Sequence, residues 1–274
     1  MIKKGAIFLT LLLLLSCRKD SEINEYAFPE NQYVVVGHAY GNPVKYKLRL
    51  YSKLLPILAN IEKFSNPTQY VFTGDVVAKA SEENWKNILK EFDSLNIDNY
   101  WISPGNHDLS SSYFKDNIQA DLYFSKRINN NLFLILNTNF AGWTVEPDQL
   151  EMINAELNDL DGIQNIFVFS HQVWWKNKEQ AVYDMSNIIT NAPYLQNGNT
   201  NFWQDAFPLF QKTDLPIYFF AGDVGAWDFI PAFVYNKFDN FHFYASGLGG
   251  GAEDNIINIK TFGNGNVEIE RIDF

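Results

Sequence analysis

The chain has 274 residues, 46% of them hydrophobic and 16% aromatic, which is enough to bury one large core or two small ones. Its formal net charge of −11 argues against a nucleic-acid partner, because proteins that bind nucleic acid normally present a basic face to the phosphates. Phosphate-containing small molecules are not excluded, since a bound cation can reverse the local field. The single cysteine, Cys17, excludes an intramolecular disulfide and a cluster of thiolate ligands.

The first sixteen residues are typical of a signal peptide. Lys3 and Lys4 form a short positive region, and residues 6–15 are almost wholly apolar. This apolar run is too short for a normal membrane span. We therefore expect residues 1–16 to be removed from the mature protein.

The end of that segment, Leu14-Leu15-Ser16-Cys17, resembles a bacterial lipobox, in which the cysteine becomes the lipidated first residue. The resemblance implies a lipid anchor on Cys17 and a place at the bacterial cell envelope, on the outer membrane or the periplasmic face. Residues 17–31 are then the lipidated cysteine and a polar tether, and residues 32–274 form one domain. An ordinary signal peptide with an incidental cysteine is the alternative.

Short apolar runs alternate with helical spacing through the first two-thirds of the chain. The runs predict strands at residues 33–36, 70–72, 99–102, 132–136, 166–169 and 216–221. The spacing predicts helices at residues 46–64, 81–92 and 147–160. Pro56 should kink or split the first helix, and Ser81 should cap the second. Residues 172–215 indicate only long loops around short helices.

After Gly222 and Asp223 the pattern changes to strands without helices between them. These strands are expected at residues 229–235, 241–245, 255–262 and 267–273, in an antiparallel arrangement. An alternating α/β region followed by an all-strand region fits a sandwich of two sheets with helices outside.

Five of the expected strands end in polar side chains. The segments are Gly37-His38, Gly74-Asp75, Gly105-Asn106-His107-Asp108, Ser170-His171 and Gly222-Asp223. Because the carboxyl ends of parallel strands lie along one edge of a sheet, we expect these groups to meet. Mixed Asp, Asn and His ligands suit a divalent metal such as Zn, Mn or Fe. The remaining histidine, His242, lies inside an aromatic strand, where we expect a hydrogen-bonded structural role.

Four segments at these strand ends resemble the calcineurin-like metallophosphoesterases. Residues 71–75 (VFTGD), 104–108 (PGNHD), 169–175 (FSHQVWW) and 219–227 (FFAGDVGAW) resemble the second to fifth motifs of that family. The resemblance implies a four-layer double β-sandwich flanked by helices, one or two divalent metals, and hydrolysis of a phosphomonoester or phosphodiester.

The same resemblance assigns roles to single residues. Asp75 would be the bridging metal ligand, and Asn106 and His171 would bind the second metal. His107 would stabilise the transition state or protonate the leaving oxygen, and its neighbour Asp108 is the other catalytic candidate.

Two motifs depart from the family pattern. The first, normally Asp-x-His, is His38-Ala39-Tyr40 here, and the fifth, normally Gly-His-x-His, is Gly222-Asp223-Val224-Gly225. In one interpretation a single metal remains, bound by Asp75, Asn106, His171 and Asp223. In another, Asp and His have exchanged places, so that His38 and Asp223 support an altered two-metal centre. In the last, the site has decayed and the protein is a ligand-binding envelope lipoprotein on an old scaffold.

Large aromatic residues follow the same strand ends. Trp143, Trp174, Trp175 and Trp227 could form an apolar wall for a lipid or nucleoside, a stacking platform for a sugar, or only a packed lid. We take Tyr40, Trp174 and Trp227 as candidate substrate-binding residues. The expected ligand is a phosphate-containing small molecule, lipid or glycan.

Overall fold

A computed structural model describes residues 28–45, 48–109, 112–176, 185, 188–191 and 200–274. The expected signal peptide, the expected lipidation site Cys17 and most of the expected tether lie outside the described residues. No helix in the described part of the chain is long and apolar enough to cross a membrane. The first described segment already pairs with the last third of the chain, because the backbone N–H of Glu30 donates to the carbonyl of Thr261.

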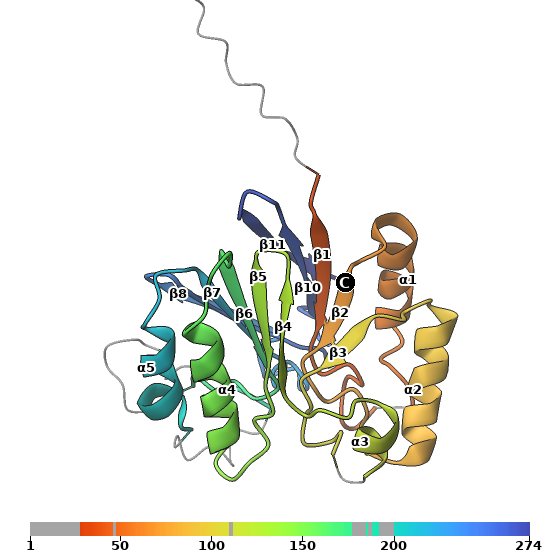
Figure 1. Cartoon of the computed structure of the whole chain (residues 1–274). Helices are drawn as coiled ribbons and strands as arrows, with labels where there is room; N and C mark the ends of the chain where they lie inside the picture. The colour runs from red at the N-terminus through yellow and green to blue at the C-terminus, as the bar shows by residue number, and fades with distance from the viewer. Residues whose placement is uncertain (1–27, 46–47, 110–111, 177–184, 186–187, 192–199) are drawn as a thin grey trace, which may run out of the picture.

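Two sheets lie face to face at the centre of the molecule (Figure 1). In the first, the order β11-β10-β1-β2-β3 joins β1 (Asn31–Val36), β2 (Gln69–Phe72), β3 (Tyr100–Ile102), β10 (Asn255–Thr261) and β11 (Val267–Asp273). In the second, the order β4-β5-β6-β7-β9-β8 joins β4 (Phe124–Ile128), β5 (Asn131–Ile135), β6 (Asn165–Ser170), β7 (Ile217–Ala221), β8 (Phe233–Phe238) and β9 (Phe241–Ser246).

Helices cover the outer face of each sheet, so the molecule has four layers (Figure 1). The helices on the first sheet are α1 (Leu54–Ser65), α2 (Glu82–Ser94) and the short α3 (Tyr113–Asn117). Those on the second are α4 (Pro147–Leu157), the π-helical turn η1 (Phe202–Ala206) and α5 (Phe207–Phe210). The four-layer double β-sandwich expected from the sequence is therefore confirmed.

Most of the expected elements are present, with three corrections. Helix α1 begins at Leu54 rather than at residue 46, because Pro56 lacks an N–H and is tolerated only in the first turn. Strand β8 begins at Phe233 rather than at residue 229. The last third is not wholly antiparallel, because β9 pairs with β7 in parallel. Strand β4 and the short helix α3 were not expected, whereas η1 and α5 are short helices of the kind expected within residues 172–215.

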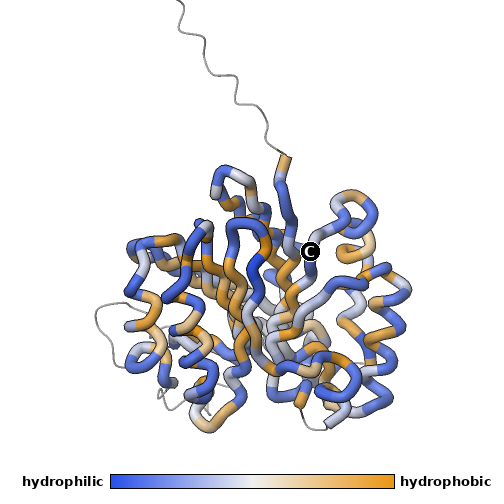
Figure 2. Tube along the Cα trace, viewed as in Figure 1, coloured by the Kyte–Doolittle hydropathy of each residue, from blue (hydrophilic) through white to orange (hydrophobic). Residues whose placement is uncertain are grey.

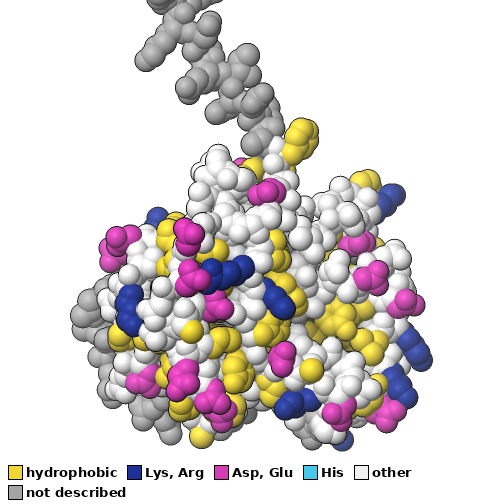
Figure 3. Space-filling model, in the orientation of Figure 1, with side chains coloured by type: hydrophobic (Ala, Val, Ile, Leu, Met, Phe, Trp, Pro, Cys, Tyr) yellow, Lys and Arg dark blue, Asp and Glu magenta, His cyan; other side chains and the backbone are white. Residues whose placement is uncertain are grey.

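Alternation along the central strands separates the inner core from the outer ones. On β1, Tyr33 and Val35 face the second sheet, while Val34 and Val36 face the helices, as the period of two requires. Figure 2 shows the apolar strands enclosed by hydrophilic loops and helix surfaces. On the face drawn in Figure 3, acidic and basic side chains are interspersed with apolar ones.

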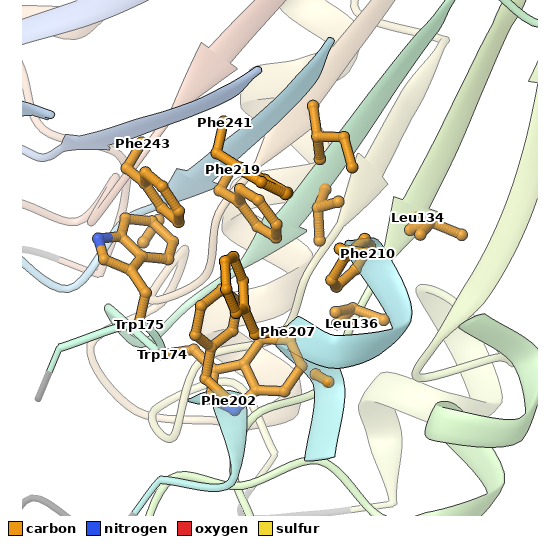
Figure 4. Packing of buried hydrophobic residues seen from close by; sticks show 14 of the residues in the cluster. Leu134, Leu136, Trp174, Trp175, Phe202, Phe207, Phe210, Phe219, Phe241 and Phe243 are labelled. Atoms are coloured by element: carbon orange, nitrogen blue, oxygen red, sulfur yellow. The ribbon is translucent and has the colours of Figure 1, made fainter. Parts of the chain in front are cut away.

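The core outside the second sheet is rich in aromatic rings. Phe219 and Phe243, on neighbouring strands, stack with their centroids 4.8 Å apart and their planes within 5°. Trp174 and Phe202 meet edge to face beneath them (Figure 4). This packing fixes the segment that follows β6, and that segment begins with the site residue His171.

Candidate active site

The polar strand ends of both sheets meet at one edge of the sandwich. His38 follows β1, Asp75 follows β2 and Asn106-His107 follow β3 in the first sheet, while His171 follows β6 and Asp223 follows β7 in the second. A cavity of ≈ 220 Å³ opens there. Its lining includes His38, Tyr40, Asp75, Asn106, His107, Trp143, Asn191, Asp223 and Trp227. His171 lies fully buried beside Asp75.

Asp75 is the centre of this cluster, and its two carboxylate oxygens face different histidines. Oδ1 lies 3.3 Å from His171 Nε2, and Oδ2 lies 3.5 Å from His38 Nε2. The Oδ1 atom of Asp223 is 4.0 Å from the same nitrogen of His171. Side chains from both sheets therefore converge on one carboxylate.

All three histidines are oriented in the same way, by a backbone carbonyl at Nδ1. His38 contacts the carbonyl of Leu248 at 3.0 Å, His107 that of Ala78 at 2.7 Å, and His171 that of Thr73 at 2.8 Å. With Nδ1 donating, Nε2 is the free ring atom, as in histidines that bind metals. The Nε2 of His171 is buried and makes no hydrogen bond within the described part of the chain, although carboxylates surround it.

Burial and close charges shift the pKa values of these groups in different directions. Burial lowers the pKa of His38 to about 4, so this ring is neutral at pH 7. Burial also lowers the pKa of His171, but Asp75 and Asp223 outweigh it and raise that pKa to about 10. Burial would raise the pKa of Asp75, but His171, His38 and His107 hold it well below its usual range. Burial raises the pKa of Asp223 to about 7, with Asp75 adding to the effect and His171 opposing it.

The backbone at the site is strained. His38, Asp75 and Trp143 all line the cavity with φ values of 51°, 52° and 58°, in the left-handed region that residues with a Cβ rarely adopt. Such conformations concentrate at functional sites, where the surrounding structure holds them in place.

The glycines of the strand-end turns make room for these side chains. A Cβ on Gly105 would come within 2.2 Å of Asp75 Oδ1, and one on Gly74 within 2.5 Å of His171 Nδ1. No other residue fits at these two positions, because the neighbouring side chain occupies the space.

Residues 48–236 match the model of the calcineurin-like phosphoesterase family. The chain belongs to this family. Among the solved structures that match is that of a conserved uncharacterized protein of Streptococcus pneumoniae, described as a predicted phosphoesterase. The two share 8% identity with a TM-score of 0.36 over 89% of this chain and 98% of that one. No curated protein matches the chain.

Calcineurin-like phosphoesterases usually bind divalent metal ions, and the polar side chains around Asp75 are the available ligands for such an ion. In the described ranges, no group of three or more His, Cys, Asp or Glu side chains has a geometry ready to hold a metal ion. The chemical types of the side chains, carboxylate and imidazole, nevertheless fit a divalent metal ion. One carboxylate oxygen of Asp75 faces His38 of the first sheet, and the other faces His171 of the second. The Nε2 of His171 is buried among carboxylates without a hydrogen bond within the described residues. A metal ion there would bind this nitrogen directly, in place of the proton that Asp75 and Asp223 stabilise on it.

Asp108, which the sequence predicted as a catalytic residue, is not among the residues that line the cavity. Its carboxylate is fully buried and accepts backbone N–H groups from Val76 at 3.0 Å, Val77 at 3.2 Å and Gly105 at 2.8 Å. Burial and the Asp75 charge raise the pKa of Asp108 to about 7. Its contacts are those of a positioning residue that ties the turn after β2 to the turn after β3.

Of the three expected substrate-binding residues, two line the cavity. The Tyr40 ring lies between His38 and His107, with centroids 4.4 Å and 5.4 Å away. Trp227 also lines the cavity. Trp174 is instead a core residue, since its side chain is fully buried and its Nε1 donates to Asn201. His242 has the expected structural role, with Nδ1 3.2 Å from the hydroxyl of Tyr235.

Asn191 is a site residue that the sequence did not reveal. It lines the cavity, its N–H donates to the carbonyl of Asp223 at 3.0 Å, and its Oδ1 accepts the N–H of Ala226 at 2.8 Å. These bonds hold the turn that carries Asp223. Asn191 lies between expected strands and in no motif, so no local pattern could have identified it. Asn106, an expected ligand, is exposed at the cavity mouth.

Proposed function

We propose that this protein hydrolyses phosphoesters with one or two divalent metal ions. The observation that carries the proposal is the pair of histidines from different sheets, His38 and His171, whose Nε2 atoms face the two oxygens of Asp75. In a member of the calcineurin-like phosphoesterase family, this arrangement suits a carboxylate shared between metal positions.

Asp75, His171 and Asp223 would hold one metal, with Asn106 close enough to the cavity to join them. His38 would hold a second metal together with Asp75. When bound, the metal would supply Lewis-acid polarisation of the phosphoryl oxygen. His107 faces the same cavity and can hold a proton at Nε2 for the leaving oxygen, because its Nδ1 is fixed on the carbonyl of Ala78.

The metal content of the wild type separates the decayed site, which would bind no metal, from the other two interpretations of the altered motifs, and single variants separate those two. Asp75→Ala should abolish metal binding, because this carboxylate serves either centre. His38→Ala should lower the stoichiometry measured by elemental analysis from two to one if Asp and His have exchanged places, and leave it at one if only a single metal is bound. His242→Ala, which removes a histidine far from the site, is the matched control. Full metal content in Asp75→Ala would show that the proposed ligand set is wrong.

Turnover tests the enzymatic part of the proposal. Added Mn²⁺, Zn²⁺ or Fe²⁺ should support cleavage of a nitrophenyl phosphate monoester or diester, and a chelator should stop it. A folded protein that binds phosphate ligands but gives no turnover with any metal would instead be a degenerate phosphoesterase scaffold acting as a ligand-binding lipoprotein.

We further propose that the protein acts at the bacterial envelope, anchored through Cys17. The support is the sequence of the leader, with Lys3-Lys4, the apolar run at residues 6–15 and the lipobox-like end. A diacyl group together with an N-terminal acyl chain would suffice for stable anchoring. Cys17→Ser should therefore release the protein from the membrane fraction. A variant that stays membrane-bound and is cleaved at the same position would overturn the lipoprotein assignment.

A further inference from the structure

A second cavity of ≈ 350 Å³ opens beside the candidate active site. Trp227 lines both cavities, so that the two are neighbours across one side chain. The other residues that line the second cavity are Gly225, residues 228–232 and residues 251–253. None of these residues belongs to the proposed metal site.

Both walls of this second cavity are held by backbone hydrogen bonds. The N–H of Ile230 donates to the carbonyl of Trp227 at 2.8 Å, which closes a tight turn with Asp228 and Phe229 at its tip. On either side of the lining residues 251–253, the buried carboxylate of Asp254 accepts the N–H groups of Gly249 and Gly250 at 2.9 Å each. The cavity is therefore formed before any ligand arrives.

The tip of the turn presents aromatic surface to solvent. The rings of Trp227 and Phe229 are nearly parallel, with an interplanar angle of 18° and centroids 6.3 Å apart. Phe229 is 72% exposed, although the same turn buries Ile230 almost completely. An exposed phenylalanine contributes little to packing, but the face of its ring is available to a ligand.

The charged side chains that line the cavity are both acidic. Asp228 and Glu253 are exposed acidic residues in its lining. Neither of the two cavities is lined by a lysine or arginine among the residues that the structure describes. Two positive groups lie outside the lining: Lys53 acts on Asp254, and the guanidinium of Arg271 lies 4.8 Å from the ring centre of Phe233, the residue that follows Ala232.

Aromatic faces and carboxylates attract the same kind of group, an organic cation, and an ammonium that carries methyl groups satisfies both. An anionic group would be repelled, and a neutral one would gain no charge attraction from Asp228 and Glu253. We propose that this cavity binds the ammonium end of an amino-alcohol phosphoester, with choline as the representative, while its phosphate lies in the neighbouring site. The assignment of a substrate rests on the proposed phosphoesterase function, but the binding of the cation does not.

Direct binding to the purified full-length protein, measured by calorimetry with a chelator present, tests the site without turnover. Choline and its neutral isostere 3,3-dimethylbutanol, in which carbon replaces the nitrogen, are the two probes. Choline should bind saturably and about tenfold more tightly than the isostere, as expected for a cation on partly exposed aromatic faces.

Four variants should weaken choline binding several-fold: Trp227→Leu, Phe229→Leu, Asp228→Asn and Glu253→Gln. The leucine variants keep the apolar surface and remove only the ring. The matched controls are Phe64→Leu, an exposed phenylalanine on α1, and Glu83→Gln, an exposed acid on α2. Both controls should bind choline as the wild type does.

Equal binding of both probes would show a merely apolar cavity, suited to a lipid or sugar, and would overturn the proposal. So would the absence of saturable choline binding, or choline binding that Trp227→Leu and Phe229→Leu leave unchanged. Choline binding without metal-dependent turnover would defeat the proposed hydrolysis alone. Turnover without choline binding would defeat this inference alone.

Discussion

At the scale of single residues, the site depends on a few positions where both the backbone conformation and the size of the side chain are tightly restricted. His38 and Asp75 adopt strained backbone conformations with positive φ where they line the cavity. Gly74 and Gly105 have no Cβ, and the side chains of His171 and Asp75 occupy the space that a Cβ would need. The segment Thr73-Gly74-Asp75 therefore has a physical reason for its glycine, which is to let a histidine of the other sheet approach.

Gly74→Ala should lower metal binding sharply, because the new methyl group would lie 2.5 Å from the ring of His171 and push it away from Asp75. Gly162→Ala is the matched control. Gly162 also has positive φ, at 72°, but a Cβ there meets no atom within 4 Å.

Each alanine should cost about 1 kcal/mol of backbone strain in the free energy of unfolding. Only Gly74→Ala should also lose metal in elemental analysis. Equal metal content in the two variants would show that the position of His171 does not depend on this glycine.

At the scale of elements, strands were more predictable than the segments between them. The apolar runs placed β1, β2, β6 and β7 to within a few residues, since buried parallel strands need continuous hydrophobic sequence. Strand β4 was missed because its sequence, Phe-Ser-Lys-Arg-Ile, is polar at its centre and lies at the edge of its sheet.

The loop after β6 shows the limit of motif reasoning. Trp174 lies in a motif-like segment next to His171, yet its side chain points into the core with Phe202 rather than toward the cavity (Figure 4). Residues that are close in sequence after a strand can point into the cavity or into the core, and their residue types alone do not show which.

Trp174→Ala should therefore act on stability, at a cost of about 3–5 kcal/mol in the free energy of unfolding. If that variant does not fold, Trp174→Phe is the milder change, which loses the bond to Asn201 and some packing. The activity per folded molecule should stay close to wild type in both. Urea unfolding and kinetics on the same samples test this. A raised KM at unchanged stability would return Trp174 to the substrate site.

At the scale of the whole molecule, the sandwich brings its two sheets together at the cluster around Asp75. His38 and Asp75 come from one sheet, and His171 and Asp223 from the other. The sequence predicted that these strand ends would meet, because the polar groups followed buried runs. It could not predict which face of the cavity each would occupy, nor that Asn191 would support Asp223, because those contacts depend on how the two sheets pack.

The pairing of β1 with β10 also bears on the order in which the chain can fold. The side chains of Gln32 and Asn258, bonded across these strands, are 226 positions apart. During synthesis from the N-terminus, the first strand must therefore wait for nearly the whole chain before its outer neighbour exists. Closing so long a segment is slow, because its conformational entropy is lost before the stabilising contacts form. A chain that completes its first sheet this late leaves the outer edge of β1 without its neighbouring strand until β10 has been made, and an open strand edge can pair with another chain.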